Sequence, residues 1–383
     1  MRKLLLSTLL LVLPLLASAY DIKVENEDGV MIYYNYYNNR TELEVTYGTT
    51  DYNSYSGVIK IPDEVTYMSR PRKVTSIGEK AFYNCYNMTS LTLPNTITRI
   101  SDYAFYNCYG LHSLPLPEAV DWIGSYSFYN CNSLTSLTIP SSVTTIGEWA
   151  FASCCEVTSL TIPNYVASIK DYTFNDCYGL TSVTIGSSVT SIGANAFSGC
   201  SGLTTLTIPD AVTSIGEHAF SSCSSLKSVT IGNSVSTIGD YAFGQCSRLT
   251  TVISKMESPC TINSGCFHNN VYDNATLFVP DGTKKKYKNT KYWSRFVFVE
   301  EGVASVTSVN APTERIPVLI SARDGFLTVK SELEGQSVSV YTVDGKALGS
   351  ARVKGGQAVI ATNLPKGAIV VVKVGDRSVK ALL

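Results

Sequence analysis

The sequence has few charged residues and few histidines. Asp, Glu, Lys and Arg make up 16% of the 383 residues, and the formal net charge is −1. No overall field therefore favours a nucleic acid or an anionic membrane as partner. The three histidines, His112, His218 and His268, fall at unrelated positions of the repeat described below, so we interpret them as sequence drift rather than as catalytic bases.

The familiar motifs of catalytic and metal sites are also missing. The sequence contains no Gly-rich phosphate loop, no His-Glu-x-x-His and no nucleophile elbow. It has no Cys-x-x-Cys and no paired histidines, which zinc sites commonly use. The sequence therefore predicts a protein that is not an enzyme and that has no metal and no cofactor.

Apolar runs long enough to span a bilayer, about 20 residues, are missing as well. The one strongly apolar run covers residues 4–16, after Arg2 and Lys3 and before the small residues at 17–19. This order is typical of a secretory signal peptide. We expect a signal peptide at residues 1–19, cleaved after Ala19, and hence an exported chain without a transmembrane segment.

Against these absences stands one strong regularity, a period of 23 residues. Eight cysteines and eight phenylalanines each recur at that interval, and each phenylalanine lies three residues before its cysteine. They are Cys85, Cys108, Cys131, Cys154, Cys177, Cys200, Cys223 and Cys246, with Phe82, Phe105, Phe128, Phe151, Phe174, Phe197, Phe220 and Phe243. A constant period of this size indicates a repeat solenoid, in which stacked coils share one core.

Each cycle contains a strand pattern and a turn pattern. Leu137 and Ile139 alternate with polar residues, which predicts a short strand with one buried face, and Pro140 ends it. Gly147 is expected to turn the chain into a short helical turn that places Phe151 in the core. The fold class is therefore a β-rich solenoid with short helical turns.

Eleven cysteines in an exported chain would ordinarily suggest disulfides. The register instead places the repeated thiols inside the coils, stacked about 5 Å apart with parallel Cβ vectors. An odd total also leaves at least one thiol unpaired within the chain. We expect reduced, buried thiols that pack as small hydrophobes.

The full pattern, L-x-x-L-x-I-P-x-x-V-x-x-I-G-x-x-A-F-x-x-C, resembles the BspA-like leucine-rich repeats of bacterial surface proteins over residues 58–280. The resemblance implies a secreted or cell-surface protein, on the outer side of the outer membrane. It also implies adhesin-like binding of host matrix proteins, host cells or other bacteria. Two alternatives stay open, namely an envelope structural protein without a host ligand and a glycan-binding protein.

The ends of the repeat array are predicted to be capped. Residues 20–57 are expected to form an N-terminal β cap, with hairpin strands at 28–30 and 41–47, and an inserted loop is expected at 67–73. The solenoid is expected to cover residues 58–303, ending in a capping helix at 284–293 and an edge strand at 296–299.

A change of composition marks a further domain at residues 304–383, which we expect to be a small all-β sandwich. Strands are predicted at 338–343, before the turn at Asp344-Gly345, and at 368–374. The segment resembles the C-terminal sorting domains of Bacteroidetes proteins that use type IX secretion, although Ile369 stands where that family usually has Tyr. A plain accessory sandwich is the alternative.

Aromatic residues gather on the outside of the first five coils. The candidate ligand-binding residues are Tyr83, Tyr103, Tyr106, Tyr126, Tyr129, Trp149 and Tyr172. Exposed aromatic rows commonly mark surfaces that contact proteins or glycans. The alternative is that the rings pack flat across adjacent coils and only stabilise the fold.

Two charged features of the sequence are a column of carboxylates in the repeats and a lysine-rich segment after them. Carboxylates recur beside the aromatic positions, at Glu79, Asp102, Glu148, Asp171, Glu217 and Asp240. We expect them to accept hydrogen bonds from free amides, and the alternative is a row of divalent cations. The lysine-rich segment 284–295 is expected to be a solvated helix face, with binding of acidic glycans or lipid headgroups as its alternative.

Overall fold

The computed structural model describes residues 19–49 and 52–302, and in the last part of the chain residues 319–323, 326–330, 334–342, 347–362, 369–374 and 377–382. The chain divides into two compact units, residues 1–305 and 306–383. The expected signal peptide lies outside the described residues, apart from Ala19.

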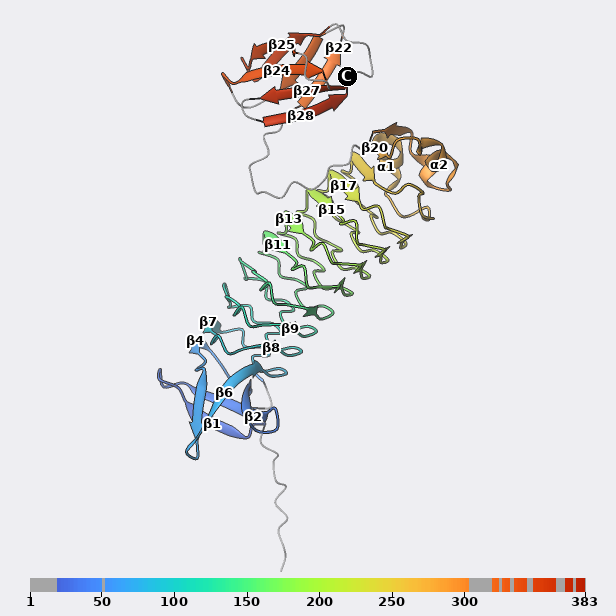
Figure 1. The fold of residues 1–383 in the computed structure, drawn as a ribbon. Coiled ribbons are helices and arrows are strands. Elements are labelled where there is room, and N and C mark those ends of the chain that lie inside the picture. Colours follow the sequence, from blue (N-terminus) through green and yellow to red (C-terminus); the bar gives the residue numbers. More distant parts are fainter. Residues whose placement is uncertain are drawn as a thin grey trace, which may run out of the picture. The chain divides into compact units, whose positions relative to one another are not determined.

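The first unit begins with an antiparallel meander (Figure 1). Its strands are β1 (Ile22–Glu25), β2 (Met31–Tyr37) and β3 (Glu42–Thr46). Strand β3 pairs in parallel with β6 (Arg70–Ile77), which belongs to the first coil of the solenoid. The meander and the coils therefore share one sheet, and the buried Ile32 and Val45 extend the core of the coils into the cap.

Two expectations for this end of the chain are wrong in detail. Residues 28–30 form the turn between β1 and β2 rather than a strand. Residues 67–73 are not an inserted loop, because β5 (Glu64–Tyr67) and β6 form a hairpin. Its turn residues, Met68 and Ser69, have φ values of 50° and 58°. Such a turn ordinarily has Asn or Gly at these positions, so the hairpin left no signal in the sequence.

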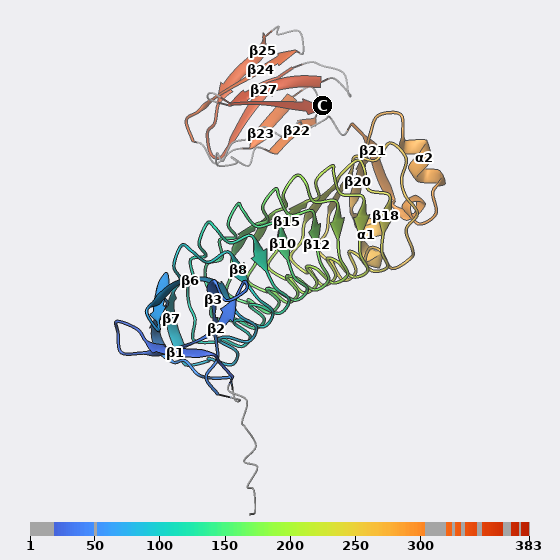
Figure 2. The ribbon, with the colours of Figure 1, turned by 60° about the horizontal axis from the view of Figure 1, so that its bottom comes forward.

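The coils stack through two columns of short parallel strands (Figure 2). One column is β4 (Gly57–Lys60), β7 (Met88–Thr92), β11 (Ser159–Thr161), β13 (Ser182–Thr184), β15 (Thr205–Thr207), β17 (Ser228–Ile231), β19 (Thr251–Ser254), β20 (Thr276–Val279) and β21 (Phe298–Glu301). The other is β6, β8 (Arg99–Ile100), β9 (Trp122–Ile123), β10 (Thr145–Ile146), β12 (Ser168–Ile169), β14 (Ser191–Ile192), β16 (Ser214–Ile215) and β18 (Thr237–Ile238).

The 23-residue period is the register between neighbouring coils. Ser159 pairs with Ser182, and Ile169 pairs with Ile192. Two coils between β7 and β11 have only an isolated bridge, Ser113 to Ser136, in the first column. Pro115 lies in this region and has no N–H to donate to a ladder.

The expected short helical turns are present as hydrogen-bonded turns that do not continue into a helix. Tyr106 N–H donates to the Tyr103 carbonyl at 3.2 Å, as in a single turn. Left-handed residues flank each turn, for example Tyr103 at φ 57° and Asn107 at φ 60°. The N–H groups of Phe105 and Asn107 instead donate to the next coil, at 2.7 and 2.9 Å. The turns thus become a third zone of contact between coils.

The glycine before each turn has a different role from the one expected. A Cβ atom on Gly147 would lie 2.3 Å from the backbone nitrogen of Ser125 in the preceding coil. Gly216 would meet Ala194 N at 2.5 Å in the same way. Close approach of adjacent backbones, rather than turning, therefore selects glycine here.

The phenylalanine and cysteine columns lie in the core, as predicted. All eight repeated phenylalanines and all eight repeated cysteines are buried. The phenylalanine rings stack at centroid distances of 4.9–5.6 Å, and Phe267 continues the stack beyond Phe243. All eleven cysteines are free thiols, and only Cys155 and Cys260 are partly exposed.

A small aromatic cluster closes the other end of the column. It comes from α1 (Asn269–Asn274), α2 (Lys284–Asn289) and the 3₁₀ helix η1 (Trp293–Arg295). The rings of Trp293 and Phe296 meet Phe267 edge-on, at 5.8 and 5.4 Å. The expected single helix at 284–293 is therefore two short helices, and the edge strand β21 begins at Phe298 rather than at 296.

The second unit is an antiparallel two-sheet sandwich. One sheet has the order β22 (Leu319–Arg323), β23 (Phe326–Lys330) and β26 (Gln357–Ala361). The other has the order β25 (Ala347–Arg352), β24 (Ser337–Thr342), β27 (Ile369–Val374) and β28 (Arg377–Leu382). Leu327 and Ile360 of the first sheet share a core with Val340 and Val372 of the second. The expected Asp344-Gly345 turn lies outside the described residues.

Candidate functional site

The seven predicted aromatic residues come together on the outer side of the turns, in two parallel rows. We call this set the aromatic ladder. The first row stacks Tyr83, Tyr106 and Tyr129 at 4.7 and 4.8 Å between ring centroids. The second row stacks Tyr103, Tyr126, Trp149 and Tyr172 at 4.9, 5.7 and 3.9 Å. Contacts of 5.8–6.4 Å join the two rows.

The backbone of the turns positions the second row. Tyr103, Tyr126, Trp149 and Tyr172 have φ values of 55–58°. Bulky residues seldom adopt this left-handed conformation, and it persists where neighbouring structure determines it. Here each of these residues donates its N–H to the next coil, as Tyr103 does to Ser125 O at 2.9 Å. The stack of coils therefore determines where these rings point.

The ladder presents ring edges rather than ring faces. Each interior ring has a neighbour on both faces, as Tyr106 has Tyr83 and Tyr129. All seven residues are partly exposed. Solvent therefore meets the outer ring edges and hydroxyl groups. A sugar that must lie on a ring face finds the interior faces covered.

The ladder extends further at its N-terminal end than the sequence indicated. Tyr52 lies edge-on to Tyr83 at 5.6 Å, and Tyr47 lies 4.4 Å from Tyr52. Neither belongs to the repeat, so the 23-residue period does not find them. The ammonium group of Lys80 lies 5.7 Å from the ring centroids of both Tyr52 and Tyr103.

The hydroxyl groups of two ladder residues, Tyr106 and Tyr126, stay protonated at neutral pH. Burial raises the pKa of Tyr106, and the neighbouring tyrosines Tyr83 and Tyr129 raise it further. Burial also raises the pKa of Tyr126, and the nearby Tyr103 and Glu148 raise it further. The ladder can therefore both donate and accept hydrogen bonds along its outer edge.

Beside the first row runs an asparagine ladder that the sequence analysis missed. Asn107 Nδ2 donates to Asn84 Oδ1 at 2.9 Å, and Asn130 Nδ2 donates to Asn107 Oδ1 at 3.0 Å. All three residues have a left-handed backbone conformation, with φ of 57–60°. The same 23-residue spacing was the signal that could have identified them. These amides tie together the first three of the coils that bear the aromatic ladder.

Two of the six recurring carboxylates, Asp102 and Asp171, accept hydrogen bonds from free amides as expected, but the amides belong to the next coil. Asp102 Oδ1 accepts from Ser125 N–H at 2.8 Å, and Asp171 Oδ1 accepts from Ala194 N–H at 2.7 Å. Glu79 pairs with the ammonium group of Lys80 at 3.0 Å. Within the part of the chain that the structure describes, no three Asp, Glu, His or Cys side chains are grouped to hold a metal ion.

Much of the lysine-rich segment serves the C-terminal cap. Lys286 Nζ donates to Glu257 O at 2.8 Å, and Lys288 Nζ donates to Phe296 O at 2.6 Å. The guanidinium group of Arg295 lies 4.2 Å from the Tyr272 ring centroid. These cations satisfy carbonyl groups and cover an aromatic ring, so the segment is only partly a solvated helix face.

The three histidines have separate local contacts. His112 Nδ1 lies 2.8 Å from Gly110 O, and His268 caps the first turn of α1. His218 stacks on Tyr241 at 5.1 Å. These contacts do not assemble the three imidazoles into one group.

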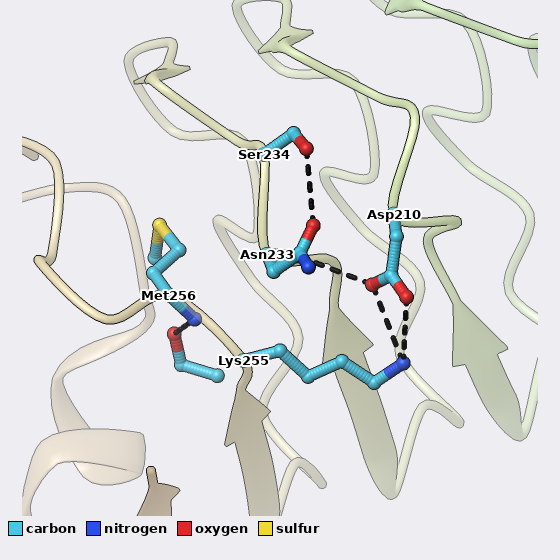
Figure 3. A network of polar contacts seen from close by, with 6 residues as sticks. Asp210, Asn233, Ser234, Lys255 and Met256 are labelled. Atoms are coloured by element: carbon cyan, nitrogen blue, oxygen red, sulfur yellow. Dashed lines mark hydrogen bonds and ion pairs between the residues drawn. The ribbon is translucent and has the colours of Figure 1, made fainter. Parts of the chain in front are cut away.

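A polar network ties three coils together near the C-terminal end of the solenoid (Figure 3). Lys255 Nζ lies 3.3 Å from both carboxylate oxygens of Asp210, and Asn233 N–H donates to Asp210 Oδ1 at 3.1 Å. Ser234 Oγ donates to Asn233 Oδ1 at 3.0 Å. These contacts link Asp210, Asn233 and Lys255 of three successive coils, so the network holds the coils in register.

Comparison with solved structures gives leucine-rich repeat proteins. A leucine-rich repeat protein from Bacteroides ovatus is 25% identical, with a TM-score of 0.56 over 74% of this chain and 77% of that one. A leucine rich cell surface protein from Faecalibacterium prausnitzii is 23% identical, with a TM-score of 0.44 over 74% of this chain and 96% of that one. A leucine-rich repeat protein from Treponema pallidum is 23% identical, with a TM-score of 0.41 over 57% of this chain and 87% of that one.

The sequence also matches a protein family directly. The family described as "BspA type Leucine rich repeat region" matches in six copies, over residues 61–181 and 145–274. No curated protein matches the sequence significantly. The family match covers more than half of the chain, and its repeats are the coils that carry the cysteine and phenylalanine columns. The chain therefore belongs to the BspA-type leucine-rich repeat family.

Proposed function

We propose that this protein acts outside the bacterial cell as a non-enzymatic binding protein, and that the aromatic ladder is its contact surface. The observation that carries the proposal is the continuity of the ladder. Seven partly exposed aromatic side chains adjoin one another over the coils from Tyr83 to Tyr172. Aromatic residues are enriched in protein interfaces, and a rigid array adds weak contacts over several coils.

Export is part of the proposal and rests on the sequence of residues 1–19 and on the family resemblance. Among the described residues, no helix is long and apolar enough to cross a membrane. We propose in addition that residues 304–383 act as a sorting domain of the type IX kind. The partners that the family resemblance implies are host matrix proteins, host cells or other bacteria.

Two other functions remain as alternatives, an envelope structural role and glycan binding. The covered ring faces favour a protein partner over a glycan, because sugars commonly stack on exposed faces while polypeptides also bind ring edges and hydroxyl groups. The envelope role differs from both in needing no ligand on the ladder.

The test compares retention of purified matrix proteins and of mucin glycans by the chain from Tyr20 onward. We expect at least one of the purified matrix proteins to be retained by the unchanged chain. The double variant Tyr106→Ser, Tyr129→Ser should lose this retention. The control combines Tyr165→Ser with Tyr241→Ser, two tyrosines that are 72% and 49% exposed outside the ladder. Retention that survives the ladder substitutions in a folded variant would exclude the ladder as the contact surface. Retention of mucin alone would favour glycan binding.

A further inference from the structure

The carboxylates of the repeats are concentrated beside the aromatic ladder. Residues 74–253 contain eleven acidic and five basic side chains, a net charge of −6. Six of the eleven acids form the single column described above, and all six are exposed. In three coils a carboxylate directly precedes a ladder residue: Asp102 precedes Tyr103, Glu148 precedes Trp149, and Asp171 precedes Tyr172. The ladder therefore has an acidic margin along one side.

The first coil shows how a cation fits this surface. Lys80 occupies the position that Tyr103 occupies one coil later. Its ammonium group lies 3.0 Å from Glu79 Oε1 and 5.7 Å from the centroids of Tyr52 and Tyr103. A lysine of this chain thus already combines a carboxylate with aromatic rings. At Trp149 and Tyr172 the carboxylates are present but the column has an aromatic residue instead of lysine.

Nearby basic side chains offset only part of this charge. The basic residues in the turns that carry the ladder are Lys80 and Lys170. Arg99, the third cation of these coils, lies over the Trp122 ring at 4.2 Å on the second strand column. A ligand that approaches the ladder therefore meets a surface of negative sign with neutral hydroxyl groups at its centre.

We infer that the aromatic ladder binds a lysine- or arginine-rich polypeptide segment of its protein partner, with the cations placed between the carboxylate column and the outer edges of the rings. The inference rests on the proposed function and names the chemistry of the partner. Tyrosine hydroxyl oxygens and carboxylates accept hydrogen bonds from ammonium and guanidinium groups. The stems of lysine and arginine can pack on the exposed ring edges.

The experiment uses a fluorescein-labelled (Lys-Gly)₅ peptide and the chain from Tyr20 onward, with binding followed by fluorescence anisotropy. A (Glu-Gly)₅ peptide is the comparison ligand. The test variant combines Glu148→Gln with Asp171→Asn, which removes two charges and keeps an oxygen that can accept from Ala194 N–H. The control variant combines Glu118→Gln with Asp121→Asn, two exposed acids outside the column.

We expect the basic peptide to bind and the acidic one not to bind. The test variant should weaken binding about three- to tenfold, and the control variant less than about twofold. Binding by the unchanged chain should also weaken as salt rises, because exposed charges are screened. Equal losses in the two variants, or no binding of (Lys-Gly)₅, would overturn the inference.

The same proteins separate failure of this inference from failure of the proposed function. In one outcome, retention of the matrix protein is abolished by the Tyr106→Ser and Tyr129→Ser substitutions. The same retention is unaffected by Glu148→Gln with Asp171→Asn and by excess (Lys-Gly)₅. The ladder is then the contact surface and its partner is not basic. If the tyrosine substitutions leave retention unchanged, the proposed function itself fails.

Discussion

The thiol of Cys108 donates a hydrogen bond to the carbonyl oxygen of Phe82 in the preceding coil, with 3.1 Å between Sγ and O. The same bond, at 3.1–3.4 Å, joins six further cysteines to the phenylalanine 26 residues earlier: Cys131, Cys154, Cys177, Cys200, Cys223 and Cys246. The Phe82 carbonyl also accepts from Cys85 N–H at 3.1 Å. The column thus requires a residue that is small, apolar and able to donate one hydrogen bond.

Replacement of one such cysteine should measurably destabilise the solenoid. Cys131→Ala removes the donor to Phe105 O and leaves a small cavity in a fully buried site. We expect a loss of about 1–2 kcal/mol in the free energy of unfolding. Urea unfolding followed by circular dichroism measures it. Cys155→Ala, at a partly exposed thiol, should cost less than about 0.5 kcal/mol, and equal losses at both sites would contradict this account.

Stability should fall at alkaline pH because of the same column. Burial raises the pKa of Cys131 from 9.0 to about 12 and the pKa of Cys85 from 9.0 to about 11. Between pH 9 and these values the unfolded chain releases thiol protons that the folded chain retains. The stabilisation is therefore complete below pH 9 and is lost as the pH rises towards 12. Urea unfolding at pH 7, 8, 9 and 10 should show a plateau and then a decline, and a decline that begins below pH 8 would need another cause.

Periodicity in the sequence predicted what every coil shares, and it could not predict what lies between coils. The Phe82 and Cys85 columns followed from spacing alone, because equivalent residues of stacked coils must share one environment. The roles of Gly147 and Asp171 depend on contacts with a neighbouring backbone, which a linear pattern does not show. The hairpin at Met68 lies in a segment without repeats, so neither period nor turn composition revealed it.

The close approach at Gly147 gives a second stability test. In Gly147→Ala the new methyl group would lie 2.3 Å from Ser125 N, an atom of the backbone that cannot rotate away. The coils must separate locally, so we expect a loss of about 2 kcal/mol or more. Thermal unfolding of this variant should be compared with that of Ser141→Ala, an exposed site in the same coil. Unchanged stability in Gly147→Ala would show that the coils can move apart freely.

The candidate site could be predicted from the sequence as a set of residues but not as a surface. The recurrence of Tyr103 and its equivalents placed them on one side of the coils. Whether the rings cover each other or face solvent depends on the left-handed backbone conformation of these residues. An aromatic residue gives no indication of that conformation in the sequence. The inclusion of Tyr52 depends on how the N-terminal cap folds against the first coil.

A double-mutant cycle measures how strongly the rings of the ladder support each other. Trp149 and Tyr172 stack at 3.9 Å with an interplanar angle of 4°. We expect Trp149→Ala and Tyr172→Ala to couple by about 0.5–1.5 kcal/mol in unfolding experiments. Trp149 and Tyr241 are far apart in the repeat array, and the same cycle on that pair should give a coupling near zero. Without coupling between Trp149 and Tyr172, the stack would not contribute to stability, and the rings would need another explanation.

The carboxylate column should stabilise the fold through hydrogen bonds rather than through bound cations. Asp171 Oδ1 accepts from Ala194 N–H, and asparagine can retain this bond whereas alanine cannot. We therefore expect Asp171→Ala to cost about 0.5–2 kcal/mol and Asp171→Asn only a small part of that. Added calcium or a chelator should leave the melting temperature of the unchanged chain where it was. If calcium raises the melting temperature of the unchanged chain but not that of Asp171→Ala or Asp171→Asn, Asp171 is instead a cation ligand. Because Asp171→Asn separates the charge from the hydrogen bond, a stable Asp171→Asn variant also shows that any change in peptide binding comes from the lost charge and not from a loosened coil.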